Sequence, residues 1–333
     1  MSIHKIFCFG EILLHYAPPS GTNYLDSHQM PFYLGGAELN VATALAKWEV
    51  PVKYATAMPA NFLTDTIISD LANKNIDTSA IQFSGHRIGC FYLATGLDMK
   101  SAAVVYDRDN SSFASIQIGS IAWKEVLKDV HWFHFSAISA SLTQNATDVC
   151  EEALIAATEL GIPISVDLNY RAKLWQYGKT PIEVMTRLVK YCTVLMGNLW
   201  AVEEMLGIQS SIQSSEGFST TDLEQAAHKS MTTLKEQFPI LNTMAYTFRL
   251  TDSYFGLMFN KNNFYTSSIY KMNEVKNIVG SGDCFMAGLI YGIRQHHTPE
   301  EIINFAAAAA VGKLNELGDA TEQSLEQIKK RML

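Results

Sequence analysis

The sequence predicts an α/β fold in which helices cover both faces of a mostly parallel central sheet. Two observations predict it. Short apolar runs of strand length alternate with longer segments whose apolar residues recur at helical spacing. Hydrophobic residues also make up 48% of the 333 residues, which is enough for a large core. In sheets of this kind ligands bind beyond the carboxyl ends of the strands, so residues that follow a strand are candidates for a site.

The two kinds of segment follow one another along most of the chain. The expected strands are residues 3–9, 52–57, 132–136, 163–167, 193–196 and 243–247. The expected helices are residues 37–48, 63–73, 144–160, 181–189 and 221–237. The helix over 144–160 is followed by Gly161, which is typical of a helix end. This alternation indicates parallel strands joined by helical crossovers.

Two regions depart from this alternation. Residues 12–34 and 89–118 are interpreted as extended segments with turns between them, and the second contains a hairpin around Asp98. We expect one domain over residues 1–333, in which these two segments form a small β-flap. Such a flap closes over a substrate and excludes water. The alternative is an ordinary surface hairpin.

Charge and composition argue against several classes of function. The net charge of −8 is unfavourable for a protein that binds nucleic acid through its phosphates. The five cysteines are scattered, without the paired spacing of a disulfide framework or a zinc site. We find neither a membrane-spanning apolar run nor a signal peptide. We therefore expect a cytoplasmic protein without a nucleic-acid or membrane partner.

A glycine-rich turn near the C-terminus carries the strongest indication of chemistry. Gly280-Ser281-Gly282-Asp283 opens a predicted helix, and it matches neither a Rossmann fingerprint nor a Walker P-loop. Glycines let several N–H groups point one way, and a helix N-terminus attracts anions. The turn suits a phosphoryl group in transfer, with Asp283 accepting the proton of an attacking hydroxyl. The alternative is that Asp283 only caps the helix.

A second glycine pair, Gly35-Gly36, precedes the helix expected over residues 37–48. Its backbone allows a polyol to approach closely, and Asn40 offers both a donor and an acceptor. On its own, a tight turn with Asn40 bonded to the backbone is the better interpretation. The pair becomes informative only beside the motif near the C-terminus.

Together the two motifs resemble those of the ribokinase-like (PfkB) carbohydrate kinase family. Gly-Gly-Ala-x-x-Asn near the N-terminus and Gly-Ser-Gly-Asp near the C-terminus stand in the family's order, and the resemblance covers nearly the whole chain. Within the family the chain is most similar to 2-keto-3-deoxygluconate kinases. Tyr106-Asp107-Arg108 resembles their Tyr-x-Arg, and residues 167–175 resemble their Asp-x-Asn-x-Arg-x-x-Leu-Trp. The resemblance implies a ribokinase-like three-layer fold and ATP-dependent phosphorylation of 2-keto-3-deoxygluconate to its 6-phosphate.

The resemblance also implies a role for each matching residue. Asp283 is the general base, and the backbone N–H groups of Gly280, Ser281 and Gly282 form the anion hole. The implied sugar-acid contacts are Gly35, Gly36, Asn40, Tyr106, Arg108 and Arg171. The implied nucleotide contacts are Asn198, Thr247, Arg249, Gly280, Gly282 and Asn315. The two arginines suit a sugar that carries a carboxylate, which arginine binds with two parallel hydrogen bonds; the alternative for each is an ordinary ion pair.

The chain departs from the family at two positions that concern metal and nucleotide. Ala201 stands where the Asn-x-x-Glu motif beginning at Asn198 has its glutamate, and Asn277 stands where an aspartate usually precedes the catalytic motif. We expect ATP and Mg²⁺ as cofactors, assign no metal ligand, and regard a monovalent cation as doubtful because Asn277 is uncharged.

Two alternative functions stay open. One is a fructokinase-like kinase for a neutral sugar, and the other is a catalytically weakened relative that binds a sugar acid. Because flap strands in this family often pair between subunits, the resemblance also implies a homodimer through those strands.

Overall fold

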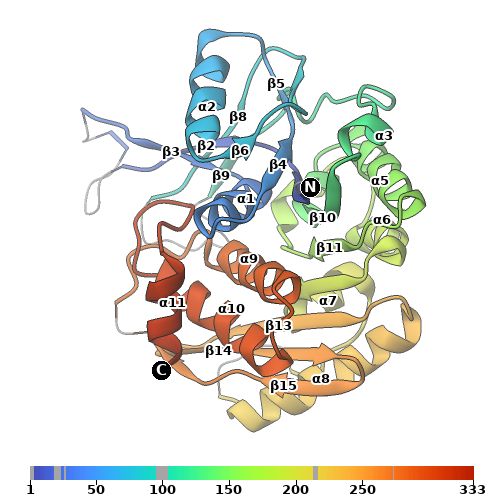
Figure 1. Cartoon of the computed structure of the whole chain (residues 1–333), viewed down its shortest axis with the longest axis vertical. Coiled ribbons are helices and arrows are strands. Elements are labelled where there is room, and N and C mark those ends of the chain that lie inside the picture. The colour runs from blue at the N-terminus through green and yellow to red at the C-terminus, as the bar shows by residue number, and fades with distance from the viewer. Residues whose placement is uncertain (1–3, 19–23, 26–27, 95–103, 213–216, 273) are drawn as a thin grey trace.

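A ten-stranded mixed sheet forms the centre of the computed structural model, which describes residues 4–18, 24–25, 28–94, 104–212, 217–272 and 274–333. Its parallel part consists of β6 (Ile76–Asp77), β4 (Val52–Ala55), β1 (Lys5–Phe9), β10 (Val130–Ser136), β11 (Ile164–Asp167), β12 (Val194–Gly197) and β13 (Thr243–Arg249), in that spatial order. Its antiparallel edge consists of β14 (Ser253–Asn260), β15 (Asn263–Thr266) and β16 (Tyr270–Lys271). The prediction of a mostly parallel sheet is confirmed (Figure 1).

The antiparallel edge was not part of the predicted pattern. Residues 253–260 form a nearly continuous apolar run, which resembles a buried parallel strand. The turn that reverses the chain places Lys261 at φ 46° and Asn262 at φ 70°, as a two-residue hairpin turn requires. The sequence clue was therefore the Asn pair that follows Lys261, set between two apolar segments.

Residues 52–57 were expected to form one strand, and the structure divides them. β4 ends at Ala55, and β5 (Ala57–Met58) pairs with β7 (Gln82–Phe83) in a separate two-stranded sheet. The change of partner begins at Thr56, whose carbonyl accepts a hydrogen bond from the N–H of Gln82. An apolar run does not reveal such a change because both parts are buried.

Helices cover both faces of the sheet, as predicted (Figure 1). One layer comprises α1 (Ala37–Lys47), α2 (Phe62–Asn73), α9 (Ser281–Arg294), α10 (Pro299–Lys313) and α11 (Leu325–Met332). The other comprises α3 (Trp123–Val126), α4 (Ala137–Ala140), α5 (Gln144–Glu159), α6 (Pro181–Leu188), α7 (Leu199–Leu206) and α8 (Thr220–Gln237). Alternate residues of β1 separate the two cores, since Phe7 and Phe9 pack on the α5 side and Ile6 and Cys8 on the α1 side.

Helices α9 and α10 pack with their backbones close together. Residues 306–310 are five consecutive alanines, and each is fully buried. A Cβ placed on Gly288 would lie 2.6 Å from the Cα of Ala306, so only glycine fits at this crossing. This close contact fixes the end of α10 relative to the beginning of α9, where the glycine-rich turn lies.

A second, four-stranded sheet stands apart from the central one (Figure 1). Its order is β3 (Phe32–Gly35), β2 (Leu13–Tyr16), β8 (Gly89–Tyr92) and β9 (Val105–Asp107), and β8 and β9 run antiparallel. Asp98, the predicted centre of the hairpin, lies outside the described residues. The function of this sheet as a flap stays a prediction.

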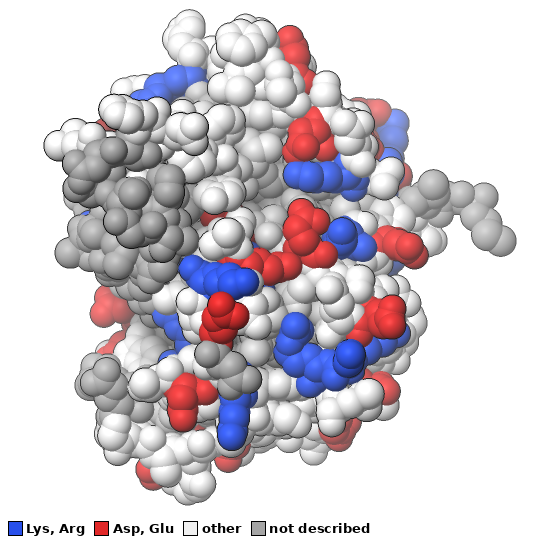
Figure 2. All heavy atoms as spheres, turned by 90° about the vertical axis from the view of Figure 1, so that its left-hand side faces the viewer, with Lys and Arg blue, Asp and Glu red and all other residues white. Residues whose placement is uncertain are grey.

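The surface carries charges of both signs. On the face that Figure 2 shows, acidic and basic side chains are interspersed, and neither sign covers a large area. Within the described residues, no helix combines the length and the apolar character needed to cross a membrane.

Candidate functional site

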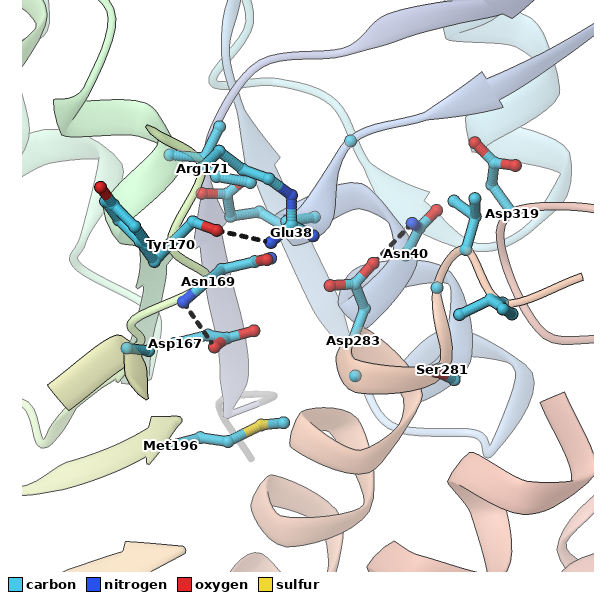
Figure 3. A pocket seen from close by; sticks show the side chains of 18 of the residues that line it. Glu38, Asn40, Asp167, Asn169, Tyr170, Arg171, Met196, Ser281, Asp283 and Asp319 are labelled. Carbon is cyan, nitrogen blue, oxygen red and sulfur yellow. Dashed lines mark hydrogen bonds between the residues drawn. The ribbon is translucent and has the colours of Figure 1, made fainter. Parts of the chain in front are cut away.

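A cavity of about 310 Å³ lies where the carboxyl ends of β11, β12 and β13 face the four-stranded sheet. Most of the predicted site residues line it: Gly36, Asn40, Tyr106, Arg108, Arg171, Asn198, Thr247, Arg249, Gly280, Ser281, Gly282 and Asp283. They come from the four-stranded sheet, from the beginnings of α1, α7 and α9, and from the ends of β11 and β13 (Figure 3). The topology therefore brings distant motifs to one place, at the edge of the sheet where α/β folds bind ligands.

Two of the predicted residues do not line the cavity. Gly35 lies just behind the wall, where a Cβ would come within 2.6 Å of the Asp319 carboxylate. Asn315 is exposed, and its N–H closes the last turn of α10 by bonding to Gly312 O at 3.1 Å. The geometry thus gives no support to the predicted nucleotide contact of Asn315, which stays a prediction.

Asp283 lies in the first turn of α9 but does not cap it. The N-cap is Gly280, which makes no side-chain capping bond. The carboxylate instead accepts a hydrogen bond of 2.7 Å from Asn40 Nδ2, so the two side chains point toward one another in Figure 3. The alternative interpretation, in which Asp283 only caps the helix, is therefore not observed. The other amide atom, Asn40 Oδ1, is buried without a hydrogen-bond partner.

Burial raises the pKa of Asp283 to about 8, well above the usual range of an aspartate. The negative charges of Asp167 and Glu38 raise it further, whereas the hydrogen bond from Asn40 and the charge of Arg171 oppose the rise. A carboxyl group whose pKa lies near neutrality is well matched to accept and return a proton. Burial likewise raises the pKa of Asp167 to about 6, against the hydrogen bond that it accepts from the N–H of Asn169.

Gly280 gives the turn its shape. It adopts φ 81°, and a Cβ there would lie 1.8 Å from the backbone oxygen of Asp319. No other residue fits this position without moving that backbone. The N–H groups of Ser281 and Gly282 stand at the N-terminus of a helix of 14 residues, where they attract an anion, and the N–H of Ser281 also makes a long hydrogen bond of 3.4 Å to Ile278 O.

A tight turn after β11 positions Arg171. Asn169 adopts φ 27°, and the N–H of this residue bonds to Asp167 Oδ1 at 3.0 Å. Arg171 Nη1 then donates to Tyr170 O at 2.9 Å, while its Nε is buried without a partner (Figure 3). This guanidinium still has an unsatisfied donor, which a ligand in the cavity would complete.

Arg108 has a partner that the sequence analysis did not identify. Its Nε and Nη2 both lie 2.6 Å from Glu11 Oε2, and both side chains are at most 5% exposed. Ser111 donates to the other oxygen of Glu11. The ion-pair alternative for Arg108 is therefore present, although buried rather than on the surface. An arginine has five N–H donors, so the pair leaves donors for a ligand. Glu11 lies two residues beyond the end of β1, and this position after a strand was the available clue.

Two further carboxylates line the cavity and were also missed. Glu38 Oε1 accepts hydrogen bonds from the N–H and Oγ of Ser136 and from Ser139 Oγ. Asp319 Oδ1 lies 2.8 Å from His15 Nδ1, and its Oδ2 is buried without a partner. Glu38 stood inside the Gly-Gly-Ala-x-x-Asn motif, whereas Asp319 belongs to a loop after α10 that no motif indicated.

The two motifs that depart from the family pattern, at Ala201 and at Asn277, make hydrogen bonds within the protein. Asn198 caps α7 by accepting the N–H of Ala201 at 2.9 Å. Asn277 donates to Leu317 O at 2.7 Å and accepts the N–H of Val279 at 3.0 Å. Throughout the described residues, no group of three or more His, Cys, Asp or Glu side chains is placed to hold a metal ion.

The sequence matches the model of the pfkB family carbohydrate kinases over residues 3–325. The chain belongs to the pfkB family of carbohydrate kinases. This confirms the family and the ribokinase-like three-layer fold that the motifs predicted. The cavity with its glycine-rich turn is accordingly the candidate active site of a pfkB family kinase.

Solved structures of pfkB family kinases and other kinases resemble the chain over nearly its whole length. The 2-dehydro-3-deoxygluconokinase of Thermotoga maritima is 30% identical, with a TM-score of 0.89 over 99% of both chains. A putative 2-keto-3-deoxygluconate kinase from Enterococcus faecalis is 23% identical, with a TM-score of 0.84 over 98% of this chain and 95% of that one. A putative ribokinase II of E. coli, in complex with ATP and Mg²⁺, is 16% identical with a TM-score of 0.81.

Sequence relatives carry similar names. The 2-dehydro-3-deoxygalactonokinase of Haloferax volcanii is 26% identical over 171 residues, which is 51% of this chain and 54% of that protein. The chain thus spans only about half the length of this relative. The 5-dehydro-2-deoxygluconokinase of Geobacillus thermodenitrificans is 22% identical over 284 residues, or 84% of this chain and 77% of that protein.

Proposed function

We propose that the chain is an ATP-dependent kinase that phosphorylates a keto-deoxy sugar acid, with 2-keto-3-deoxygluconate converted to its 6-phosphate. One observation carries the proposal: a buried Asp283 beside an anion-binding turn shares its cavity with Arg171, whose Nε lacks a partner. The first two features suit phosphoryl transfer to a hydroxyl. The third suits a substrate with a carboxylate. The Thermotoga relative, named 2-dehydro-3-deoxygluconokinase, supports the same substrate class.

The sugar acid would occupy the part of the cavity between α1 and the four-stranded sheet. Asn40 Oδ1 is a buried acceptor without a partner, which a sugar hydroxyl would satisfy. Arg108, Arg171 and Tyr106 line the same cavity. A neutral sugar would offer the guanidinium of Arg171 only a hydroxyl, which lacks the charge and the paired oxygens of a carboxylate.

The nucleotide would occupy the part of the cavity near the ends of β12 and β13. Asn198, Thr247 and Arg249 line this part, and the N–H groups at the start of α9 receive the phosphates. Magnesium, when bound, neutralises phosphate charge and needs few protein ligands because it keeps several waters. This agrees with Ala201 at the cavity wall and with the absence of a carboxylate cluster from the described residues. We propose no monovalent cation, since the Nδ2 and the Oδ1 of Asn277 each already make a hydrogen bond.

In the proposed step, the Asp283 carboxylate accepts the proton of the sugar hydroxyl. The hydroxyl oxygen forms a bond to the terminal phosphorus of ATP, the bond to the bridging oxygen breaks, and ADP leaves. The N–H groups of Ser281 and Gly282 donate to the phosphoryl oxygens as charge moves onto them. Asn40 holds the carboxylate of Asp283 in place throughout.

We propose that residues 1–333 act as a single kinase domain, with the four-stranded sheet closing over the sugar. The sheet exposes Phe32 (48%) and Val105 (57%), which are apolar positions suited to pairing with a second copy in a homodimer. Light scattering of the purified chain tests this: the mass of a monomer at micromolar concentration would refute the dimer. Cytoplasmic localisation remains a prediction from the sequence.

A coupled assay of ADP formation tests the proposed function. The wild type is expected to turn over 2-keto-3-deoxygluconate with ATP and Mg²⁺, and Asp283→Asn is expected to lose activity about a thousandfold. Turnover of fructose in preference to the sugar acid would favour the neutral-sugar alternative. Calorimetric binding of the sugar acid without ATP binding or turnover would favour a non-catalytic relative, and a fully active Asp283→Asn variant would refute the proposed base.

A further inference from the structure

Lys313 is the last residue of α10, and its side chain is fully buried. Among the residues that the structure describes, its Nζ has no hydrogen-bond partner. The side chain lies directly behind the glycine-rich turn, because its Cε would be 3.3 Å from a Cβ placed on Gly280. It does not line the cavity, so it does not contact a ligand itself. No motif in the sequence indicated this residue.

The surroundings of Lys313 are mainly acidic. Glu316, Asp319 and Asp283 face it, together with the thiol of Cys284. Glu316 Oε2 and Asp319 Oδ2 are buried without hydrogen-bond partners of their own. Burial lowers the pKa of Lys313, while the nearby carboxylates, Glu316 first, oppose that change. Their charges favour the ammonium form.

Stability alone gives no reason for such a lysine. Burying an ammonium group without a hydrogen bond is unfavourable, and an apolar side chain of similar volume is often more stabilising at such sites. The close packing of α9 on α10 holds the group at one place behind the turn. A group that weakens the fold and is held at a catalytic turn is best explained by a function there.

We propose that Lys313 is a positioning residue that places a fixed positive charge behind the anion-binding turn of Gly280 to Gly282. The inference rests on the proposed kinase function and extends it. The ammonium group attracts the Asp319 carboxylate and supports the loop whose backbone oxygen lies against Gly280. Its charge also adds to the positive end of α9, in a buried place where water screens it little. The phosphates of ATP then meet N–H groups that are already in position.

Three variants test the role of the charge. Lys313→Met keeps the length of the side chain and removes the charge, Lys313→Arg keeps the charge, and Lys313→Ala leaves a space for an added cation. We expect kcat/KM for ATP to fall about tenfold or more in the Met variant, with KM for the sugar acid unchanged. The melting temperature of the Met variant should equal or exceed that of the wild type. The Arg variant should retain more activity than the Met variant.

Added ethylammonium should restore activity to Lys313→Ala and leave Lys313→Met unaffected. The matched control is Lys276→Met, which removes an exposed lysine from the segment that precedes the glycine-rich turn and should change nothing. A Met variant within twofold of the wild type in kcat/KM for ATP would overturn the inference. So would a loss that accompanies a lower melting temperature and resists ethylammonium, because that combination indicates a structural role.

The same variants separate this inference from the proposed function. If the wild type turns over no sugar acid, the proposed function fails, and calorimetry with Mg-ATP then tests Lys313 by binding alone. Weaker ATP binding in Lys313→Met, with normal binding in Lys276→Met, supports the inference. Equal affinities in all three proteins overturn it.

Discussion

Asn40 and Asp283 stand 243 positions apart in the sequence, and a hydrogen bond of 2.7 Å joins their side chains inside the cavity. The bond connects the first turns of α1 and α9, each of which begins at a glycine. It orients the carboxylate proposed as the base, and it stabilises the charged form of that carboxylate. The pair therefore determines both where the proton is accepted and at what pH.

Removing the donor of this bond should shift the pH dependence of catalysis. Asn40→Ala eliminates a hydrogen bond that lowers the pKa of Asp283, so that pKa should rise above about 8. Because the proposed base acts when deprotonated, the acidic limb of the kcat profile should move to higher pH. The profile is measured by the coupled assay between pH 6 and pH 10 with both substrates saturating. A limb that stays in place would mean that another group limits the rate.

Stability should also depend on pH through Asp283. Its pKa is about 8 in the folded protein, against an ordinary 3.8, so the folded state holds a proton that the unfolded state has lost between these values. The contribution of Asp283 to the free energy of unfolding is therefore fully present below pH 3.8 and is lost as the pH rises toward 8. Asp283→Asn removes this dependence, so it should melt higher than the wild type at pH 8.5, and the difference should shrink toward pH 5. If the melting temperatures of the wild type and of Asp283→Asn differ by the same amount at every pH, the prediction is wrong.

Gly280 should not tolerate even alanine. Its φ of 81° disfavours a side chain, and the Cβ would lie 1.8 Å from Asp319 O, so the turn must move. Gly280→Ala should lower kcat about a hundredfold or more. Gly119→Ala is the control, since φ is 76° there and nothing lies within 4 Å of the added carbon. That variant should lose about 1 kcal/mol of stability and keep its activity, as thermal melting and the coupled assay will show.

The two arginines should respond differently to truncation. Arg108→Ala leaves Glu11 buried and unpaired, which should reduce the free energy of unfolding by about 3–5 kcal/mol. Arg171 forms no ion pair with any of the described residues, so Arg171→Ala leaves no carboxylate without its partner and opens the proposed ligand site. It should raise KM for the sugar acid about tenfold with little change in stability. Urea unfolding and substrate titration measure the two effects, and the double variant Glu11→Gln/Arg108→Met should recover much of the lost stability. Equal destabilisation by both single variants would refute the distinction.

Local patterns predicted most of the fold. Parallel strands are buried on both faces, so they appear as apolar runs, and the helices between them show a clear periodicity. The prediction failed where two structures share one pattern, as at residues 253–260, which are as apolar as a parallel strand but run antiparallel. It also failed at Thr56, where the chain changes sheets inside one buried run.

The site was predicted to the extent that its residues lie in contiguous motifs. Gly280 to Asp283 and Gly36 to Asn40 each form part of one helix start. Spacing alone left both open to a structural interpretation, and their joint resemblance to the family motifs made them informative. Glu11 and Asp319 enter the cavity from separate loops, and only the folded chain brings them to Arg108 and His15. Asn315 lies outside the cavity lining for a related reason, since the position of a side chain at a helix end is a tertiary property, and its nucleotide contact stays a prediction.

Asp319 connects the four-stranded sheet with the glycine-rich turn. Its carboxylate bonds to His15 in the four-stranded sheet, and its backbone oxygen touches the space behind Gly280. A displacement of that sheet therefore reaches the phosphate-binding turn through a single residue. If the sheet closes when sugar enters, Asp319 would join the closed sheet to a turn that is already in position, and water would have little chance to consume ATP in an empty site. The connection would limit the hydrolysis of ATP in the absence of sugar, in addition to any selection of the substrate.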